Sequence, residues 1–363
     1  MKQQVLFIGD LNTNLPEYKS FTEKFECIRY ELTTVEQLIE DFKGKLKNIR
    51  AIYGAWLGFV PLGGFKGAII DNAPSSLKVV SICSVGYDGY DGERMAERGI
   101  ILTNVPSHGA CEPVADLVLY NAIDSFRNFK VATKNFCLEN NHTVRIRKKL
   151  EDARLDTSNG TIRLGDIDGY SFGETTIGRP NLSPRGHHAV IVGFGKIGQN
   201  IAKKLDSIGM VIHYVKRTPL SAAEESEFPY TLHYHSSLKE AGQIADLVVI
   251  ACPGTPETFH MVDKDVIGSF KKPFRIINVG RGTVIDEQAL VDGLKSGKVL
   301  FAGLDVFENE PTVNKELFER QDVVLTPHVG ASTVENFDYT AATALQNIEN
   351  VLLERGTGLH KVN

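Results

Sequence analysis

Three residues able to carry out anion binding and acid–base chemistry each follow a short apolar run in the last third of the chain. Arg281 stands between two glycines, Glu310 ends an acidic segment, and His328 lies between Pro327 and Val329. A guanidinium is a permanent cation with a fork of donors, and an imidazole with an ordinary pKa of about 6.5 exchanges protons near neutral pH. If the apolar runs are parallel strands, their carboxyl ends share one sheet edge, and the three side chains are expected to converge there.

Taken alone, each of these residues is a weak signal. A single histidine is more often a hydrogen-bonded structural residue than a catalyst, and a single carboxylate after a strand is common. The prediction of a catalytic site therefore depends on the three residue types occurring together beside a nucleotide-binding motif.

The elements that must position these residues are organised around a glycine-rich turn. Residues 189–192 are typical of a buried strand, the spacing Gly193-x-Gly195-x-x-Gly198 follows, and apolar residues then recur at helical intervals up to residue 208. Gly193 allows the tight turn, Gly195 leaves room for a pyrophosphate, and Gly198 lets the helix approach the strand. The helix start, with Lys196 and Ile197, offers free N–H groups to an anion. This context of strand, turn and helix predicts a dinucleotide-binding fold, with a glycine-rich turn of another α/β protein as the alternative.

The residues after the next predicted strand, at 211–215, bear on which dinucleotide is bound. An acidic residue there commonly binds the ribose hydroxyls of NAD, but this chain has Lys216, Arg217 and Thr218. Two cations and a hydroxyl can bind a 2′-phosphate, and no carboxylate repels it. The sequence favours NADP(H) over NAD(H). NAD(H) is the alternative, because basic residues at a strand end can also be exposed to solvent without binding a phosphate.

The composition is that of an acidic globular protein. The chain has 363 residues, 42% of them apolar, and a formal net charge of −5, which does not favour nucleic-acid binding. Its five cysteines form no closely spaced pair, so neither a disulfide framework nor a metal site is predicted, and a reducing, cytoplasmic location is expected. No membrane span or targeting signal is expected.

Strands alternate with helices along most of the chain, which predicts an α/β fold with parallel, doubly wound sheets. A first α/β unit precedes the nucleotide-binding unit, whose sheet is expected to have six or seven strands. Two loops of the first unit are candidates for substrate contact, one with Tyr53 and Trp56 and one with Val85 and Gly86. The aromatic residues could equally be core residues, and the glycine could belong to an ordinary turn.

Residues 138–185 interrupt this alternation. The segment is polar, rich in glycine, aspartate and asparagine, and longer than an ordinary connection in a compact domain. We interpret it as an excursion near the domain boundary that could pack on a partner subunit.

The motifs together resemble the family of D-isomer-specific 2-hydroxyacid dehydrogenases over nearly the whole chain. The resemblance is carried by residues 193–198, 278–282, 303–311 and 326–328, and residues 183–187 resemble the fungal D-mandelate dehydrogenase branch. It implies two Rossmann-like or flavodoxin-like domains, the catalytic one discontinuous. The substrate-binding domain would comprise residues 1–128 and 331–363. The dinucleotide-binding domain would be 129–330, with 138–185 inserted.

The resemblance also implies a role for each candidate residue. His328 would exchange a proton with the substrate oxygen, Glu310 would orient His328 and favour its protonated form, and Arg281 would hold the substrate carboxylate. Backbone N–H groups around Val85 and Gly86 would bind the remaining carboxylate oxygens. Asp305 would bind the nicotinamide carboxamide, and the remaining residues expected to line the cofactor groove are Thr258, Val279 and Gly330.

The sequence therefore predicts an NADP(H)-preferring 2-oxo acid reductase that forms a D-2-hydroxy acid, as a homodimer without nucleic-acid or membrane partners. The aromatic loop favours bulky or aromatic substrates, and a glyoxylate or hydroxypyruvate reductase is the alternative. A corepressor or scaffold that senses dinucleotides is an alternative of another class, against which the complete set of Arg281, Glu310 and His328 argues.

Overall fold

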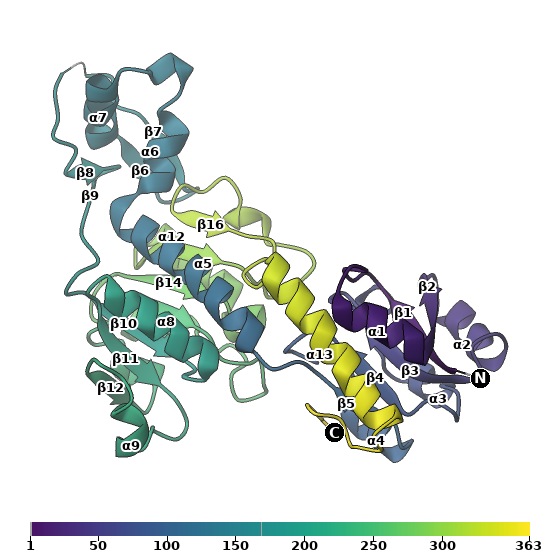
Figure 1. Ribbon diagram of the computed structural model, residues 1–363. Helices are drawn as coiled ribbons and strands as arrows, with labels where there is room; N and C mark the ends of the chain where they lie inside the picture. Colours follow the sequence, from purple (N-terminus) through teal and green to yellow (C-terminus); the bar gives the residue numbers. More distant parts are fainter. Residues whose placement is uncertain (1, 168) are drawn as a thin grey trace. The chain divides into compact units, whose positions relative to one another are not determined.

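The computed structural model describes residues 2–167 and 169–363, and the chain divides into two compact units (Figure 1). The first unit comprises Met1–Gly109 and Ser332–Asn363, and the second comprises Ala110–Ala331. Each unit is built on its own parallel sheet, as the alternation of strands and helices predicts.

The first unit contains a five-stranded sheet in the order β2-β1-β3-β4-β5, the order of flavodoxin-like folds. Its strands are β1 (Gln3–Ile8), β2 (Phe25–Tyr30), β3 (Ile49–Gly54), β4 (Val79–Ile82) and β5 (Ile101–Thr103). Its helices are α1 (Pro16–Lys24), α2 (Val35–Lys43), the 3₁₀ turn η1 (Val60–Leu62), α3 (Ala68–Asp71), α4 (Gly92–Glu97) and, from the chain's end, α13 (Val334–Leu352).

Helix α13 completes the first unit although it is the last helix in the sequence. Its buried face, with Ala341, Leu345 and Ile348, packs in one core cluster with Val5 and Phe7 of β1. Figure 1 shows this helix, in yellow, beside the purple and blue elements of the first unit. The first unit is therefore discontinuous in sequence, because α1 and the carboxyl-terminal helix α13 together cover one face of the amino-terminal sheet.

The second unit contains a seven-stranded parallel sheet in the order β12-β11-β10-β13-β14-β15-β16, an extended Rossmann arrangement. Its strands are β10 (His188–Val192), β11 (Val211–Val215), β12 (Leu232–His235), β13 (Leu247–Ile250), β14 (Phe274–Asn278), β15 (Val299–Leu304) and β16 (Val323–Leu325). The intervening helices are α8 (Lys196–Ser207), α9 (Ala222–Glu225), α10 (Leu238–Ala241), α11 (Lys264–Ser269), η3 (Gly282–Val284), α12 (Glu287–Lys295) and η4 (Lys315–Leu317). Apolar clusters cover both faces of the sheet.

Helix α5 (His108–Arg127) explains where the two units divide. The sequence placed the boundary after residue 128, at the end of this helix, whereas the structure divides the units within its first turn. The reason is packing, because Ala115, Val118, Ala122 and Phe126 lie in the core cluster that covers one face of the seven-stranded sheet.

Residues 129–181 form an arm on the second unit rather than the loop that the polar composition suggested (Figure 1). It contains α6 (Phe129–Asn135), η2 (Leu138–Asn140), α7 (Thr143–Asp152), the hairpin β6 (Arg154–Asp156) and β7 (Thr161–Arg163), and the strands β8 (Thr175–Thr176) and β9 (Arg179–Pro180). A separate small core with Val131, Ile146, Leu150 and Ile177 holds it together. This core could not be predicted from the sequence, because its apolar residues are few and widely spaced.

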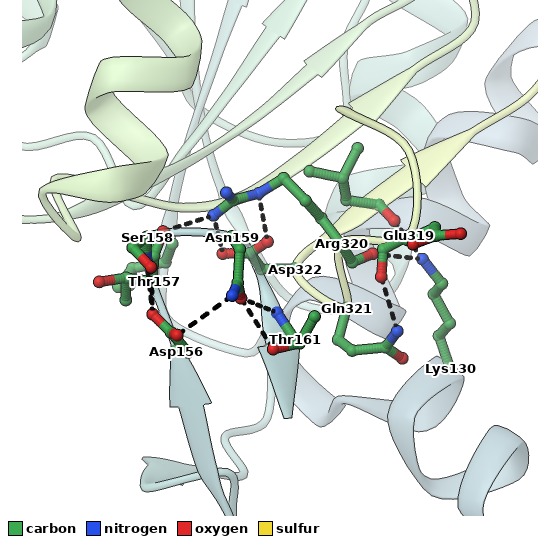
Figure 2. A network of polar contacts seen from close by, with 12 residues as sticks. Lys130, Asp156, Thr157, Ser158, Asn159, Thr161, Glu319, Arg320, Gln321 and Asp322 are labelled. Carbon is green, nitrogen blue, oxygen red and sulfur yellow. Dashed lines mark hydrogen bonds and ion pairs between the residues drawn. The ribbon is translucent and has the colours of Figure 1, made fainter. Parts of the chain in front are cut away.

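A buried arginine anchors the hairpin of this arm to the segment before β16 (Figure 2). The guanidinium of Arg320 donates two hydrogen bonds to Asp322, at 3.0 and 3.1 Å, and a third to the carbonyl of Thr157 at 3.1 Å. The N–H of Gln321 donates to the carbonyl of Gly160. A Cβ atom at Gly160, where φ is +75°, would collide with Arg320, so this turn requires glycine.

Three histidines form a hydrogen-bonded row across β10, β11 and β12. Nδ1 of His188 lies 2.8 Å from Nε2 of His213, and Nδ1 of His213 lies 3.0 Å from Nε2 of His235. A neutral imidazole has one donor and one acceptor, so neutral rings satisfy this row. Burial, reinforced by the neighbouring histidines, lowers the pKa of His213 to about 3.

His213 takes up a proton near pH 6.5 in the unfolded chain but only near pH 3 in the folded protein. Its contribution to the free energy of unfolding should therefore be fully present above about pH 6.5 and decrease as the pH falls below that value. We expect this residue to contribute a slope of about 1.4 kcal/mol per pH unit between pH 6 and 4. The check is urea unfolding of the wild type and His213→Asn across this range. The slope should be shallower in His213→Asn and unchanged in the control His360→Asn, and equal slopes in all three proteins would contradict the assignment.

Candidate active site

Three neighbouring strand ends in the second unit bring the predicted catalytic residues to one edge of the sheet. Strands β14, β15 and β16 are adjacent and parallel, and Asn278, Leu304 and Leu325 are paired at their carboxyl ends. The segments that follow these strands carry Arg281, Glu310 and His328 respectively.

The imidazole of His328 is paired with the carboxylate of Glu310. Nδ1 of His328 lies 3.1 Å from Oε2 of Glu310, and the other carboxylate oxygen accepts a hydrogen bond from the N–H of Phe307 at 3.0 Å. Burial alone would raise the pKa of Glu310. The net effect is a lowered pKa, because burial is outweighed by the hydrogen bond and charge of His328, the N–H of Phe307 and the charge of Arg281. The carboxylate is therefore ionised at neutral pH and holds one side of the imidazole.

The loop that carries His328 is held by the carboxylate of Asp305. One oxygen of Asp305 accepts from the hydroxyl of Thr326 at 2.6 Å and from the N–H of Val329 at 2.9 Å, and the other accepts from the N–H of Gly330 at 2.8 Å. His328 itself has φ +54°, a left-handed conformation that a non-glycine residue adopts at an energetic cost. Bonds on both sides of His328 thus hold it in a strained position, a role of Asp305 that the sequence analysis did not foresee.

The loop of Arg281 is fixed by the side-chain amide of Asn278 and by close packing against the acidic segment. The amide of Asn278 donates to the carbonyl of Arg281 at 2.9 Å and accepts from the N–H of Gly280 at 3.0 Å. A Cβ atom at Gly282 would lie 1.9 Å from the backbone of Phe307, so only glycine permits this approach. The charge of Arg281 is close enough to Glu310 to contribute to the lowered pKa of that carboxyl.

A second histidine–carboxylate pair supports the same loops, and the sequence analysis missed it. Nε2 of His260 lies 2.7 Å from Oε1 of Glu308, whose other oxygen accepts from the N–H of Glu287 at 3.1 Å. The carboxylate of the buried Glu287 in turn accepts from the N–H of Glu308 at 2.8 Å. The acidic run before Pro311 could have indicated Glu308, whereas His260 follows no strand end and gave no signal.

The glycine-rich turn has the three properties that its spacing predicts. Gly193 has φ +92°, and a Cβ atom there would lie 2.7 Å from the backbone of Cys252. A Cβ atom at Gly198 would lie 2.2 Å from the carbonyl oxygen of Gly193, so the helix lies close to the strand. At Gly195, the N-cap of α8, added atoms would meet nothing within 4 Å, and no side chain caps the helix start that includes Lys196 and Ile197. The turn has the open space and the unoccupied donors that a pyrophosphate requires.

The basic residues after β11 are positioned at the same edge of the sheet. Lys216 is half-buried, and Arg217 and Thr218 are exposed. The loop returns to the core at Leu220, whose N–H donates to the hydroxyl of Tyr214 at 3.1 Å. Two cations are thus presented at the position where dinucleotide-binding folds contact the ribose.

The remaining predicted cofactor residues have mixed surroundings. The hydroxyl of Thr258 donates to the carbonyl of Pro253 and accepts from the N–H of Thr255, both at 2.8 Å, which closes the loop after β13. Val279 is partly buried against the sheet, and Gly330 is bound to Asp305. Thr258 and Gly330 therefore have structural roles, and a contact with cofactor stays a proposal for all three residues.

In the first unit, the candidate substrate residues differ in their exposure. Trp56 is 52% exposed, whereas Tyr53 is 1% exposed and stacks on Phe7 with ring centroids 4.9 Å apart, so Tyr53 belongs to the core and is not available for direct substrate contact. The N–H groups of Val85 and Gly86 donate no hydrogen bond to any other described residue, while the carbonyl of Val85 accepts from Asn104 at 2.8 Å. These two N–H groups are suited to bind an anion.

Residues 2–167 and 169–363 contain no cluster of three or more histidine, cysteine or acidic side chains placed to ligate a metal ion. None of the helices in this described part combines the length and apolar character needed to cross a bilayer.

Comparisons with known proteins agree with this geometry. Residues 168–330 match the family model of the NAD-binding domain of D-isomer-specific 2-hydroxyacid dehydrogenases. Hydroxyphenylpyruvate reductase of Plectranthus scutellarioides is 30% identical over 95% of this chain and 94% of its own length.

Two solved structures are similar over the full chain. The holo form of D-mandelate dehydrogenase from Rhodotorula graminis has a TM-score of 0.84 and 31% identity, covering 100% of this chain and 98% of the other. An NADPH-dependent glyoxylate/hydroxypyruvate reductase from Sinorhizobium meliloti, in complex with NADP and malonate, has a TM-score of 0.73 and 27% identity, covering 100% and 97%.

Replacing Asp305 by asparagine should destabilise the second unit, because an amide has one acceptor oxygen for three donors. We expect the free energy of unfolding to fall by about 1–3 kcal/mol, as for other buried groups that lose a partner. The measurement is urea unfolding. Asp292→Asn is the matched control, since the exposed Asp292 accepts a side-chain hydrogen bond only from Gln288, and its effect should stay within about 0.5 kcal/mol. Equal effects of the two substitutions would show that Asp305 does not hold the loop.

Proposed function

Because this chain belongs to the D-isomer-specific 2-hydroxyacid dehydrogenases, a family of oxidoreductases, we propose that it reduces 2-oxo acids to D-2-hydroxy acids and prefers NADP(H) to NAD(H). The observation that carries this proposal is the pair of His328 and Glu310, with 3.1 Å between Nδ1 and Oε2, at the same sheet edge as Arg281. A proton donor and a carboxylate-binding cation are the two groups that such a reduction requires from the protein.

The described residues fit a dinucleotide. The open space at Gly195 and the uncapped start of α8 would accept the pyrophosphate, and Lys216, Arg217 and Thr218 would bind a 2′-phosphate. When bound, the nicotinamide supplies the hydride. The solved reductase from Sinorhizobium meliloti in complex with NADP supports this coenzyme within the same fold.

The proton chemistry belongs to His328. Glu310 is bound at Nδ1 of the ring, which leaves Nε2 as the atom to which we assign the proton donated to the substrate oxygen. The ionised carboxylate fixes the orientation of the imidazole, which makes Glu310 a positioning residue. Arg281 would bind the carboxylate of the substrate with its fork of donors and polarise the adjacent carbonyl.

For the first unit, we propose that Val85 and Gly86 contribute their N–H groups to carboxylate binding and that Trp56 contacts the substrate side chain. An exposed indole suits an aromatic or bulky substrate. The relatives named for hydroxyphenylpyruvate and D-mandelate support a bulky 2-oxo acid, and the relative named for glyoxylate and hydroxypyruvate supports a small one. Because the indole is the specific observation on this chain, bulky substrates are the first proposal.

We also propose that the chain forms a homodimer through the arm. Leu138, Tyr170 and Phe172 are large apolar side chains that are almost fully exposed on it, and such groups are commonly covered by a partner. Light scattering measures the mass directly, and a monomer at micromolar concentration would reject the dimer. None of the five cysteines, all of which lie in the described part of the chain, is joined in a disulfide, which supports a reducing, cytoplasmic location that cell fractionation tests.

The proposed activity predicts the outcome of a spectrophotometric panel of 2-oxo acids. With NADPH, phenylglyoxylate and hydroxyphenylpyruvate should be reduced with a higher kcat/KM than glyoxylate or hydroxypyruvate, because the exposed indole favours an apolar side chain. Higher kcat/KM for the small acids would select the alternative substrate class, and no reduction of any 2-oxo acid would reject the proposal.

Substitution of His328 by asparagine should lower kcat by about 10²–10⁴-fold, the usual contribution of a positioned general acid. The dissociation constant of NADPH, followed by its fluorescence, should change little because this residue is not assigned to coenzyme binding. His142→Asn, on α7 in the arm, is the control and should retain kcat. Full turnover by His328→Asn would show that another group supplies the proton.

The double substitution of Lys216 and Arg217 by alanine should raise KM for NADPH by roughly 10–100-fold, since charge-assisted hydrogen bonds to phosphate are lost. KM for NADH should stay nearly constant, because that coenzyme has no 2′-phosphate. The exposed Lys271→Ala serves as the control. If both coenzymes lose affinity equally, these residues do not select NADP(H).

A further inference from the structure

A cavity of about 200 Å³ lies within the second unit, at the edge of the sheet opposite to the catalytic loops. Its lining includes Asp246, which precedes β13, Arg275 at the start of β14, and Asp322, which precedes β16, together with the base of the arm at Arg179. The catalytic residues follow the carboxyl ends of these parallel strands, whereas this cavity lies at their amino ends.

The notable group in this cavity is the guanidinium of Arg275, which is only 8% exposed. Its Nε atom donates to the carbonyl of Ser125 at 2.8 Å, and its carbon lies 3.9 Å from the ring centroid of Phe126. Its two Nη groups donate no hydrogen bond to any other residue that the structure describes, although Arg275 lines the cavity. A buried guanidinium requires acceptors for its donors, so these Nη groups must bond to water or to a ligand that enters the cavity.

A second guanidinium, that of Arg179, lines the same cavity. One of its Nη groups donates to the carbonyl of Leu300, and the other lies 3.8 Å from a carboxylate oxygen of Asp322. Burial lowers the pKa of both arginines, that of Arg275 to about 10. The charge of Asp246 opposes this lowering at Arg275 and that of Asp322 opposes it at Arg179, whereas the charge of Arg179 adds to the lowering at Arg275. The nearby carboxylates therefore compensate the two cations only in part.

The carboxylates around the cavity already have their own cations. Asp322 accepts two hydrogen bonds from Arg320 (Figure 2). Asp246 lies 2.6 Å from Nζ of Lys272 and 3.3 Å from Nδ1 of His187.

The third carboxylate, Asp124, accepts from the N–H of Lys130 at 2.6 Å and interacts with the charge of that residue. The ammonium of Lys130 donates to the carbonyl of Arg320 (Figure 2) and to that of Val323. With Arg320, Lys272 and Lys130 assigned in this way, Arg275 and Arg179 remain as an excess of two positive charges.

We propose that this cavity is a second binding site, for a small carboxylate ligand. The carboxylate would accept hydrogen bonds from the Nη groups of Arg275, with Arg179 as the second cation, because a planar carboxylate matches a guanidinium fork. The apolar lining at Val131, Leu182 and Phe301 would contact the hydrocarbon part of the ligand, which favours an organic acid over an inorganic anion.

The test uses isobutyrate, a carboxylate that has neither a 2-oxo nor a 2-hydroxy group. Thermal unfolding is followed at constant ionic strength for the wild type, Arg275→Met and Arg281→Met. In roughly ten-fold excess over its Kd, isobutyrate should raise Tm by about 2–4 °C in the wild type and in Arg281→Met, but not in Arg275→Met. The neutral isostere isobutyramide should give no shift, and sulfate a smaller shift than isobutyrate.

Several results would overturn the proposal. A shift that is lost in Arg281→Met but kept in Arg275→Met would place the ligand at the catalytic arginine, and no shift in the wild type would exclude binding. An equal effect of sulfate would reject the preference for a carboxylate.

If Arg275→Met does not fold, Arg179→Met replaces it and should weaken the shift. A crystal structure with isobutyrate should show the carboxylate at Arg275, and a side chain of a second copy seated there would overturn the assignment.

Discussion

The carboxylate of Asp305 is the constraint on which the candidate active site depends. It lies directly after β15 and binds three donors from the neighbouring segment after β16. Residues 326–330 turn sharply after the sheet, and His328 has a positive φ. A strained backbone conformation of this kind is stable only when hydrogen bonds on both sides of the residue hold it. One buried acid therefore converts two adjacent strand ends into a rigid frame for an imidazole.

The other functional loops are fixed in a similar way, each by a contact with the strand end beside it. Glu310 and Glu308 lie on the same short segment, one bound to His328 and the other to His260 and Glu287. Gly282 brings the loop of Arg281 against the backbone of that segment. The pair of His328 and Glu310 and the guanidinium of Arg281 are therefore held by the same segment, so the fold of the second unit alone sets their relative positions.

The two edges of the seven-stranded sheet have different electrostatic properties. At the carboxyl edge, the strand ends and the uncapped start of α8 present donors and cations, which suit the proposed dinucleotide and acid substrate. At the amino edge, Asp322 pairs with Arg320 and Asp246 with Lys272, whereas Arg275 and the more distant Arg179 are compensated only in part. A fold that buries charge without compensation commonly does so for a ligand, and the proposed carboxylate site rests on this imbalance.

The sequence by itself determined the fold class, the glycine-rich turn and the sheet edge that the three candidate catalytic side chains share. Each of these depends on local pattern, since apolar runs indicate strands, glycine spacing defines the turn, and residues after parallel strands must share an edge. It could not place Tyr53 in the core, because an aromatic residue at a strand end is compatible with burial and with exposure.

Only the tertiary structure revealed the core of the arm, the support by His260 and Glu308, and the cavity at Arg275. These features join residues that are distant along the chain, such as Thr157 with Arg320 and Ser125 with Arg275. Hydrogen bonds of this kind are set by how elements pack, and no local periodicity or motif records which partner a buried polar group will find.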